Sequence, residues 1–219
     1  LVDGRWVGET LETPDNGAIA LVAAADDAND LFYTYEGFLS PDTLYHSADG
    51  GRGAVAMKSL PEFFDADGMT VEQHFATSPD GTRVPYFLVL PKGFEARADT
   101  PTLIYGYGGF EVSRAPSYSA TVGHAWLAKG GAFVVANIRG GGEYGPAWHQ
   151  AALKENRQRA YDDFIAVAED LVERGVTSLA IVREGETLLF DCGEGTQRQM
   201  MRYGVSFAFD DLFFTHVHA

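Results

Sequence analysis

Residues 18–57 alternate between short apolar runs and polar turns. Four such runs, AIALVAAA, DLFYTY, DTLYHS and AVAMKS, are separated by Asp, Asn, Pro and Gly residues. Runs of this length with turn-forming residues between them favour antiparallel strands. We therefore predict that residues 1–60 form a small piece of all-β structure.

A second pattern begins beyond about residue 60, where Pro and Asp interrupt the connector SLPEFFDADG. The runs Thr70–Ser78 and Val84–Leu90 flank the turn-forming sequence Pro79-Asp80-Gly81-Thr82. Two strand-like runs around such a turn predict a β-hairpin. We place a domain boundary at the connector, so that residues 61–178 form a second part of the chain.

Within this second part, strands and helices alternate. The apolar runs Thr102–Tyr105 and Ala132–Ile138 predict strands, the latter buried on both faces, and Tyr118–Lys129 between them predicts a helix. A strand, a helix and a second strand in succession imply a parallel sheet. The predicted fold class is therefore α/β.

An amphipathic helix is predicted over Tyr161–Arg174, ending at Gly175. Its apolar residues recur at helical spacing, and most of its acidic residues lie elsewhere around the helix. The apolar set is Phe164, Val167, Ala168 and Leu171, and the acidic set is Asp162, Asp163, Glu169, Asp170 and Glu173.

The pattern changes again in residues 179–219. Two strand-like runs, LAIVR and TLLFD, are joined by the turn Glu184-Gly185, and a helical GTQRQMMRYG then leads to the strand-like LFFTHVH. These runs predict a compact ββαβ unit as a third part of the chain.

The net charge and the single cysteine limit which binding partners and cellular locations we expect. With 31 acidic and 16 basic residues, the chain carries a formal charge of −15, which disfavours non-specific binding to nucleic acid or anionic membranes. We therefore expect no membrane partner. Cys192 is the single cysteine, so no intramolecular disulfide forms, which fits a cytoplasmic location. The chain begins at Leu1, and a periplasmic location stays open for that reason.

Several uncommon sequence motifs occur in order along residues 1–178. They are LFYTYEGFLSPDTLYH, SPDGTRVPYFLVLPKG, TLIYGYGGF, VVANIRGGGEYGPAWH and DDF. Together they resemble the prolyl oligopeptidase family of serine peptidases. The resemblance implies the last strands of a β-propeller followed by a partial α/β-hydrolase sheet. It also implies a cofactor-free enzyme that cleaves short proline-containing peptides with a Ser-His-Asp triad.

The resemblance assigns two site residues in the YGYGG turn. The Tyr107 hydroxyl would donate a hydrogen bond to the oxyanion, and Phe110 would line the substrate pocket. From the residues alone, packing of Tyr107 over the glycine turn is the favoured interpretation. For Arg139 we prefer a structural ion pair with Glu143 over a substrate contact.

No nucleophile follows these residues. In an α/β hydrolase, the serine sits in G-x-S-x-G after a strand that should follow the Tyr161–Arg174 helix, and no such motif occurs here. Ser178 lacks the flanking glycines. Both His124 and His149 precede the expected nucleophile, contrary to the chain order Ser, Asp, His, so we interpret them as non-catalytic. The peptidase is therefore predicted to be truncated and inactive.

The words DCGEGTQRQ and FFTHVHA in the tail are similar to the amino-terminal part of ribonuclease Z. That family has a metallo-β-lactamase fold and uses two zinc ions to trim the 3′ end of precursor tRNA, which makes zinc-dependent tRNA processing the alternative function. The resemblance implies that His216 and His218 belong to an incomplete zinc site. Two imidazoles hold zinc weakly, so exposed histidines without metal are the favoured interpretation.

Three further tail residues, Asp191, Gly193 and Glu194, resemble the loop near the zinc site, although a strand end and a helix cap explain them equally well. The word Val176-Thr177-Ser178 fits both families, so we place the join of two incomplete enzyme pieces at Leu179. Such a join would deprive the peptidase sheet of its central strands, and we expect exposed sheet edges and aggregation.

Overall fold

The computed structural model describes residues 4–5, 7–8, 10–14, 16–96, 100–176, 179–183, 186–190 and 211–213. The chain divides into two compact units. The first consists of Leu1–Glu62 with Ala115–Ser119, and the second consists of Phe63–Arg114 with Ala120–Ala219.

The first unit is a four-stranded antiparallel sheet. Its strands follow the order of the chain: β1 (Gly17–Ala24), β2 (Leu31–Gly37), β3 (Thr43–Ser47) and β4 (Val55–Ser59). The inner strand β2 buries Tyr33 and Tyr35, whereas the edge strands are largely exposed. The antiparallel strands predicted for residues 18–57 are confirmed, and a four-stranded sheet of this kind is the repeating unit of a propeller.

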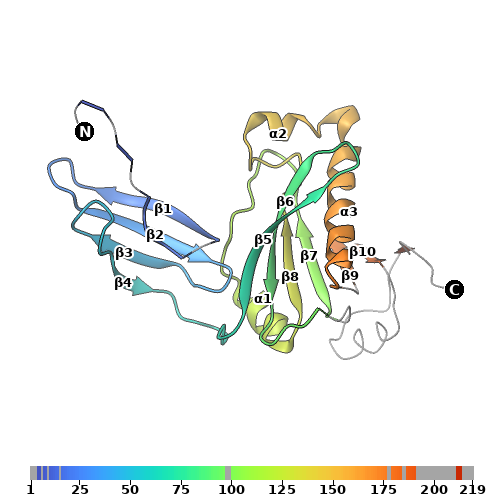
Figure 1. Ribbon diagram of the computed structural model, residues 1–219, viewed down its shortest axis with the longest axis horizontal. Coiled ribbons are helices and arrows are strands. Elements are labelled where there is room, and N and C mark those ends of the chain that lie inside the picture. Colours follow the sequence, from blue (N-terminus) through green and yellow to red (C-terminus); the bar gives the residue numbers. More distant parts are fainter. Residues whose placement is uncertain are drawn as a thin grey trace. The chain divides into compact units, whose positions relative to one another are not determined.

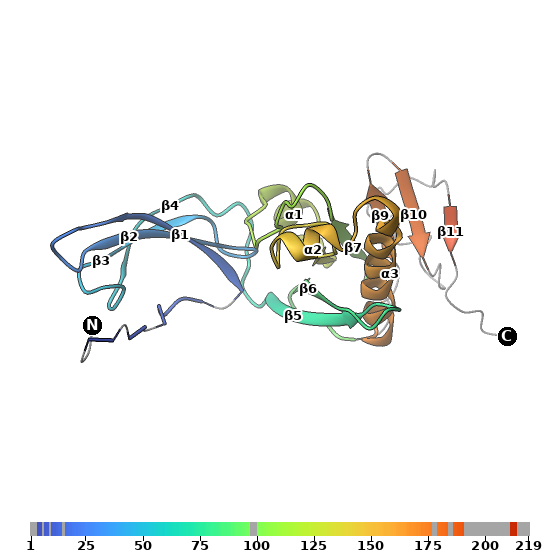
Figure 2. The ribbon, with the colours of Figure 1, turned by 90° about the horizontal axis from the view of Figure 1, so that it is seen from above.

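The second unit is built on a seven-stranded mixed sheet (Figures 1 and 2). Its strand order is β11-β10-β9-β7-β8-β6-β5. The bounds are β5 (Thr70–Thr77), β6 (Arg83–Leu90), β7 (Thr102–Gly106), β8 (Ala132–Ala136), β9 (Leu179–Arg183), β10 (Glu186–Phe190) and β11 (Asp211–Phe213). The predicted hairpin is confirmed as the antiparallel pair β5–β6, and the predicted parallel pair is confirmed as β7–β8.

Among the described residues, three α-helices and two 3₁₀ turns accompany this sheet. They are α1 (Ala120–Ala125), η1 (Leu127–Lys129), α2 (Pro146–Gln150), η2 (Lys154–Asn156) and α3 (Gln158–Glu173). The helix predicted over Tyr118–Lys129 is thus shorter, and it passes into a 3₁₀ turn that ends at Gly130 in the left-handed conformation. The long helix α3 runs along the sheet beside β5 to β8 (Figure 1).

The end of α3 follows the prediction closely. Gly175 has a φ of +74°, its N–H donates to the carbonyl of Val172, and the Val176 N–H donates to the carbonyl of Leu171. This pair of hydrogen bonds is the Schellman motif, in which glycine adopts the left-handed conformation without steric cost. Buried Val176 and Leu171 supply the apolar contact that accompanies it.

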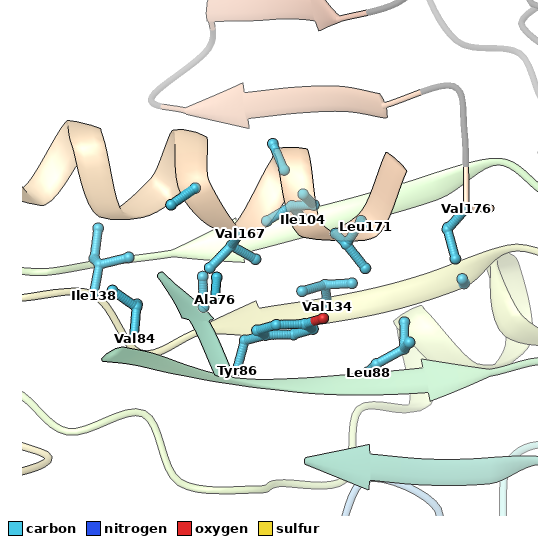
Figure 3. Close-up of a cluster of buried hydrophobic side chains, with 14 of the residues drawn as sticks. Ala76, Val84, Tyr86, Leu88, Ile104, Val134, Ile138, Val167, Leu171 and Val176 are labelled. Carbon is cyan, nitrogen blue, oxygen red and sulfur yellow. The ribbon is translucent and has the colours of Figure 1, made fainter. Parts of the chain in front are cut away.

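The core of the second unit lies between α3 and the sheet (Figure 3). Tyr86 and Val134 come from the sheet, and Val167 and Leu171 face them from α3. The predicted apolar face of the helix is therefore the buried one. One acidic residue departs from the prediction, because Asp163 is fully buried rather than on the polar side of the helix.

The tail strands extend the same sheet. Strand β9 pairs in parallel with β7, β10 pairs antiparallel with β9, and β11 pairs in parallel with β10. Strand β9 therefore covers the edge of β7 opposite β8, and the exposed sheet edges and aggregation expected from the join stay predictions. The helix predicted around residues 195–204, the metal-site histidines His216 and His218, and the loop residues Asp191, Gly193 and Glu194 lie outside the described residues.

Within the described part of the chain, no helix has both the length and the apolar character that crossing a membrane requires.

Candidate active-site edge

The candidate site lies where β7 and β8 end. Because these strands are parallel, their carboxyl ends meet at one edge of the sheet, where α/β proteins place their ligands. Two glycine-rich segments, residues 106–111 and 139–145, continue from this edge. Gly106 is required by packing, since a Cβ there would lie 2.6 Å from the ring of Phe164 on α3.

The two glycine-rich segments interlock through their backbones. A Cβ on Gly140 would lie 2.2 Å from the carbonyl oxygen of Gly108, and a Cβ on Gly142 would lie 2.2 Å from that of Glu111. Gly140 also has a φ of +99°, which disfavours any other residue. Only glycine at these positions lets the two segments approach so closely.

The turn after β7 holds two non-glycine residues in the left-handed region. Phe110 has a φ of +52° and Glu111 a φ of +56°. Such conformations cost about 1–3 kcal/mol each and persist only where surrounding contacts impose them. They tend to cluster at functional sites, so the backbone itself marks this turn as a candidate.

Hydrogen bonds from the second segment and from its neighbours impose this conformation. The Glu111 N–H lies 3.1 Å from Nδ1 of His149 and 3.3 Å from the carbonyl oxygen of Gly140. Nδ1 of His149 is also 2.7 Å from that same carbonyl oxygen, so it either accepts from the Glu111 N–H or donates to this oxygen according to its tautomer; Arg157 donates to the carbonyl of Gly108. His149, which we predicted to be non-catalytic, thus contacts the turn that carries Phe110.

Two aromatic side chains are accessible at this edge. Phe110 is 86% exposed and Tyr107 is 38% exposed, so both can contact a ligand. Their assigned roles, in oxyanion binding and in the substrate pocket, stay predictions. His124 lies exposed at the end of α1 and belongs to neither glycine-rich segment.

Arg139, the first residue of the second segment, is held by buried hydrogen bonds to Asp163 on α3. Only 4% of Arg139 is exposed, and its guanidinium forms a two-pronged hydrogen bond with the fully buried carboxylate of Asp163, at 2.9 Å from Nε and 2.6 Å from Nη2. The Arg139 backbone N–H donates to the same carboxylate at 2.9 Å. Nη1 lies 2.5 Å from Asp80 in the β5–β6 turn.

The partner that we predicted for Arg139 was therefore wrong, because Glu143 forms no ion pair with it. The role is structural: the guanidinium joins the end of β8, helix α3 and the β5–β6 turn. Hydrogen bonds from Arg139 and then from Thr82 hold the pKa of Asp80 well below its ordinary value. The bond to Asp163 raises the pKa of Arg139 above that of a free guanidinium.

Glu143 instead holds Arg114, three residues beyond the end of the first segment. Its Oε1 accepts hydrogen bonds from the Arg114 backbone N–H at 2.9 Å and from the Asn137 side chain at 3.1 Å. The same Asn137 amide donates to the carbonyl oxygen of Arg114 at 2.9 Å. This bridge was not predicted, and its signal in the sequence is limited to the polar residues Asn137 and Glu143 on either side of GGG.

A strand lies at the position after α3 where we expected the strand that precedes a nucleophile, but an antiparallel strand follows it. Strand β9 follows α3 and lies beside β7, with Leu179 opposite Thr102 and Ile181 opposite Ile104. In α/β hydrolases a tight turn with the serine and then a helix follow this strand. Here β9 ends at Arg183, and β10 returns antiparallel from Glu186.

The described residues contain no group of three or more His, Cys, Asp or Glu side chains placed to hold a metal ion. The candidate edge is formed by aromatic rings, backbone groups and arginines, which suit an organic ligand rather than a metal.

Comparisons with known proteins bear on the peptidase-like part. Residues 116–182 match the model of the prolyl oligopeptidase family. An uncharacterised peptidase of Sinorhizobium fredii is 51% identical over 176 residues, which cover 80% of this chain and 24% of that protein. The prolyl endopeptidase of Elizabethkingia miricola is 36% identical, with the same shares covered.

A solved structure gives the same relationship for the fold. A post-proline cleaving enzyme from Rickettsia typhi has a TM-score of 0.68 and 36% identity, covering 83% of this chain and 27% of that one. The chain thus spans about a quarter of the length of the relatives it matches. The likeness of the tail to ribonuclease Z stays a prediction.

Proposed function

We propose that residues up to about 178 are a truncated prolyl oligopeptidase-type serine peptidase, which keeps a peptide-binding edge and has lost hydrolysis. The observation that carries this proposal is the course of the chain after β9. This strand occupies the place next to β7, yet it leads into an antiparallel strand rather than into a serine-bearing turn.

Amide hydrolysis needs a nucleophile as well as a donor for the oxyanion. The Tyr107 hydroxyl would donate a hydrogen bond to the negative oxygen that forms when a nucleophile attacks the peptide carbonyl. A serine hydroxyl attacks only when a nearby base removes its proton. At the end of β9 the sequence is Arg183-Glu184-Gly185, which offers no hydroxyl, and so the donor has no reaction to assist.

The proposed ligands are short proline-containing peptides. Phe110 and Tyr107 present apolar ring surface at the edge of the sheet, and a proline ring is a compact apolar group that packs on such surfaces. Relatives named as prolyl endopeptidase and post-proline cleaving enzyme support the same ligand class.

We expect the chain to bind peptide without cleaving it. NMR can follow peptide binding and peptide cleavage in one sample. A blocked Gly-Pro-Ala peptide amide should shift the signals of Tyr107 and Phe110, with a Kd of about 1 mM, and no cleavage product should appear. Phe110→Ala should weaken binding about fivefold, because it removes an aromatic contact of about 1 kcal/mol. Phe63→Ala, at an exposed phenylalanine outside the glycine-rich segments, is the control.

Equal binding by the Phe110→Ala and unchanged chains would contradict the peptide-binding edge, as would the absence of any peptide-induced shift at millimolar peptide. Release of a proline-terminated product would contradict the loss of hydrolysis.

As an alternative for the tail, we propose a fragment of a zinc-dependent tRNA 3′-processing nuclease. The motifs DCGEGTQRQ and FFTHVHA support it, and β9, β10 and β11 lie where strands were expected, while the expected helix lies outside the described residues. The resemblance assigns zinc binding to His216 and His218, and two imidazoles by themselves should bind zinc more weakly than micromolar. Tighter stoichiometric binding, measured by calorimetric titration, would favour this alternative.

A further inference from the structure

The Arg114 side chain lies against the aromatic groups of the candidate edge. Its guanidinium carbon is 4.5 Å from the ring centre of Tyr107 and 5.3 Å from that of Tyr105. Both distances are within the range of cation–π contacts. The charge of Arg114 is thus held beside the phenol to which family resemblance assigns oxyanion binding.

Within the described residues, this guanidinium contacts two aromatic rings but has no hydrogen-bonded oxygen partner. Its Nε is buried without a hydrogen bond, and the side chain forms no ion pair there. An aromatic face attracts the charge but accepts none of the five N–H donors. The Arg114 side chain as a whole is half-buried, so a ligand carboxylate pairs with its terminal NH2 groups rather than with the buried Nε.

The position of Arg114 is fixed by its own backbone. Glu143 accepts its N–H and Asn137 donates to its carbonyl oxygen. The carboxylate of Glu143 is engaged with these backbone and amide donors and not with the guanidinium, and its Oε2 is itself buried without a partner. The nearby acid therefore does not neutralise Arg114 by a direct ion pair.

We propose that Arg114 binds a carboxylate of the ligand and makes this edge selective for short peptides that carry one. A guanidinium presents paired N–H donors that match the two oxygens of a carboxylate. The acid can be the carboxyl terminus of the peptide or an acidic side chain near it. This selectivity rests on the proposed peptide-binding function and refines it.

The net negative charge of the chain works against the binding of anionic peptides. At −15, the average field repels anionic peptides, so a preference for a carboxylate has to come from a local donor. Arg114 is the arginine that contacts the ring of Tyr107.

The test compares three blocked peptides by NMR titration in about 50 mM salt, where the Debye length exceeds about 10 Å. They are acetyl-Gly-Pro-Ala with a free carboxylate, the same peptide as its amide, and acetyl-Gly-Pro-Asp amide. At least one carboxylate peptide should bind about 5- to 10-fold more tightly than the neutral amide, as expected for a partly exposed charged hydrogen bond. The arm that shows the gain identifies the source of the carboxylate.

Arg114→Met should remove this preference while leaving the neutral peptide bound, and Arg114→Lys should keep part of it through its point charge. Arg83→Met is the matched control, because Arg83 makes the same type of contact with the ring of Phe75, at 4.4 Å, on another part of the sheet. Circular dichroism and thermal melting verify that each variant is folded.

An equal affinity for acidic and neutral peptides in the unchanged chain would overturn the proposal, and so would a preference that survives in Arg114→Met. If only the preference is missing, the carboxylate site is wrong and the peptide-binding edge stands. If no peptide binds at all, the proposed function fails and the carboxylate site fails with it.

Discussion

Asp163→Ala is expected to destabilise the sheet-and-helix unit by about 3–5 kcal/mol. Asp163 is fully buried, and its carboxylate accepts hydrogen bonds from Nε, Nη2 and the backbone N–H of Arg139. Its removal would leave a guanidinium that is 4% exposed with only Asp80 and Ser78 as partners. Urea unfolding followed by circular dichroism measures the loss.

The neighbouring Asp162→Ala is the matched control. Asp162 accepts one exposed hydrogen bond from Gln158, so its loss should change the free energy of unfolding by less than about 0.5 kcal/mol. An Asp163→Ala variant within 1 kcal/mol of the unchanged chain would show that the Arg139 network does not hold α3 to the sheet.

Gly140→Ala should disrupt the candidate edge with less effect on the rest of the sheet. The new Cβ would lie 2.2 Å from the carbonyl oxygen of Gly108, a backbone atom, and the left-handed φ of +99° adds strain. We expect a loss of about 2–4 kcal/mol in stability or a displaced turn. Because the turn carries Tyr107 and Phe110, peptide affinity should fall more than tenfold in NMR titration.

Gly145→Ala separates the effect of the strained φ from the effect of the close contact between the new Cβ and the backbone. Gly145 also has a left-handed φ, of +74°, but a Cβ there would meet no atom within 4 Å. It should therefore lose only about 1–2 kcal/mol through strain and keep its peptide affinity. If Gly140→Ala bound peptide as well as Gly145→Ala, the close contact between the two segments would not shape the site.

Periodicity was sufficient for the regular elements of the second unit. The apolar spacing of Val167 and Leu171 on α3 and the left-handed end at Gly175 were both predictable, because each depends on residues close in sequence. The burial of Asp163 was not, since a charge in an amphipathic pattern is expected on the solvent side. Its partner Arg139 lies 24 residues away and becomes a neighbour only when α3 packs on the sheet.

In the candidate site, too, features that depend on nearby residues were predictable and features that depend on distant residues were not. The TLIYGYGGF motif located Tyr107 and Phe110, whereas the close approach of Gly140 to Gly108 was not predicted. The left-handed φ of Phe110 could not be anticipated, because the Gly140 and His149 groups that contact the next residue, Glu111, lie about thirty residues or more further along the chain. The cation–π contact of Arg114 likewise depends on how residues 111–114 return over the ring of Tyr107.

The central claim is that a peptide-binding edge persists here without an activated serine. Labelling with a fluorophosphonate, read by intact mass, tests it most directly, because this reagent modifies only serines that a neighbouring base has activated. The prolyl endopeptidase of Elizabethkingia miricola, labelled in parallel, is the positive control. We predict no adduct on this chain, and one adduct per molecule on any of its serines would contradict the claim.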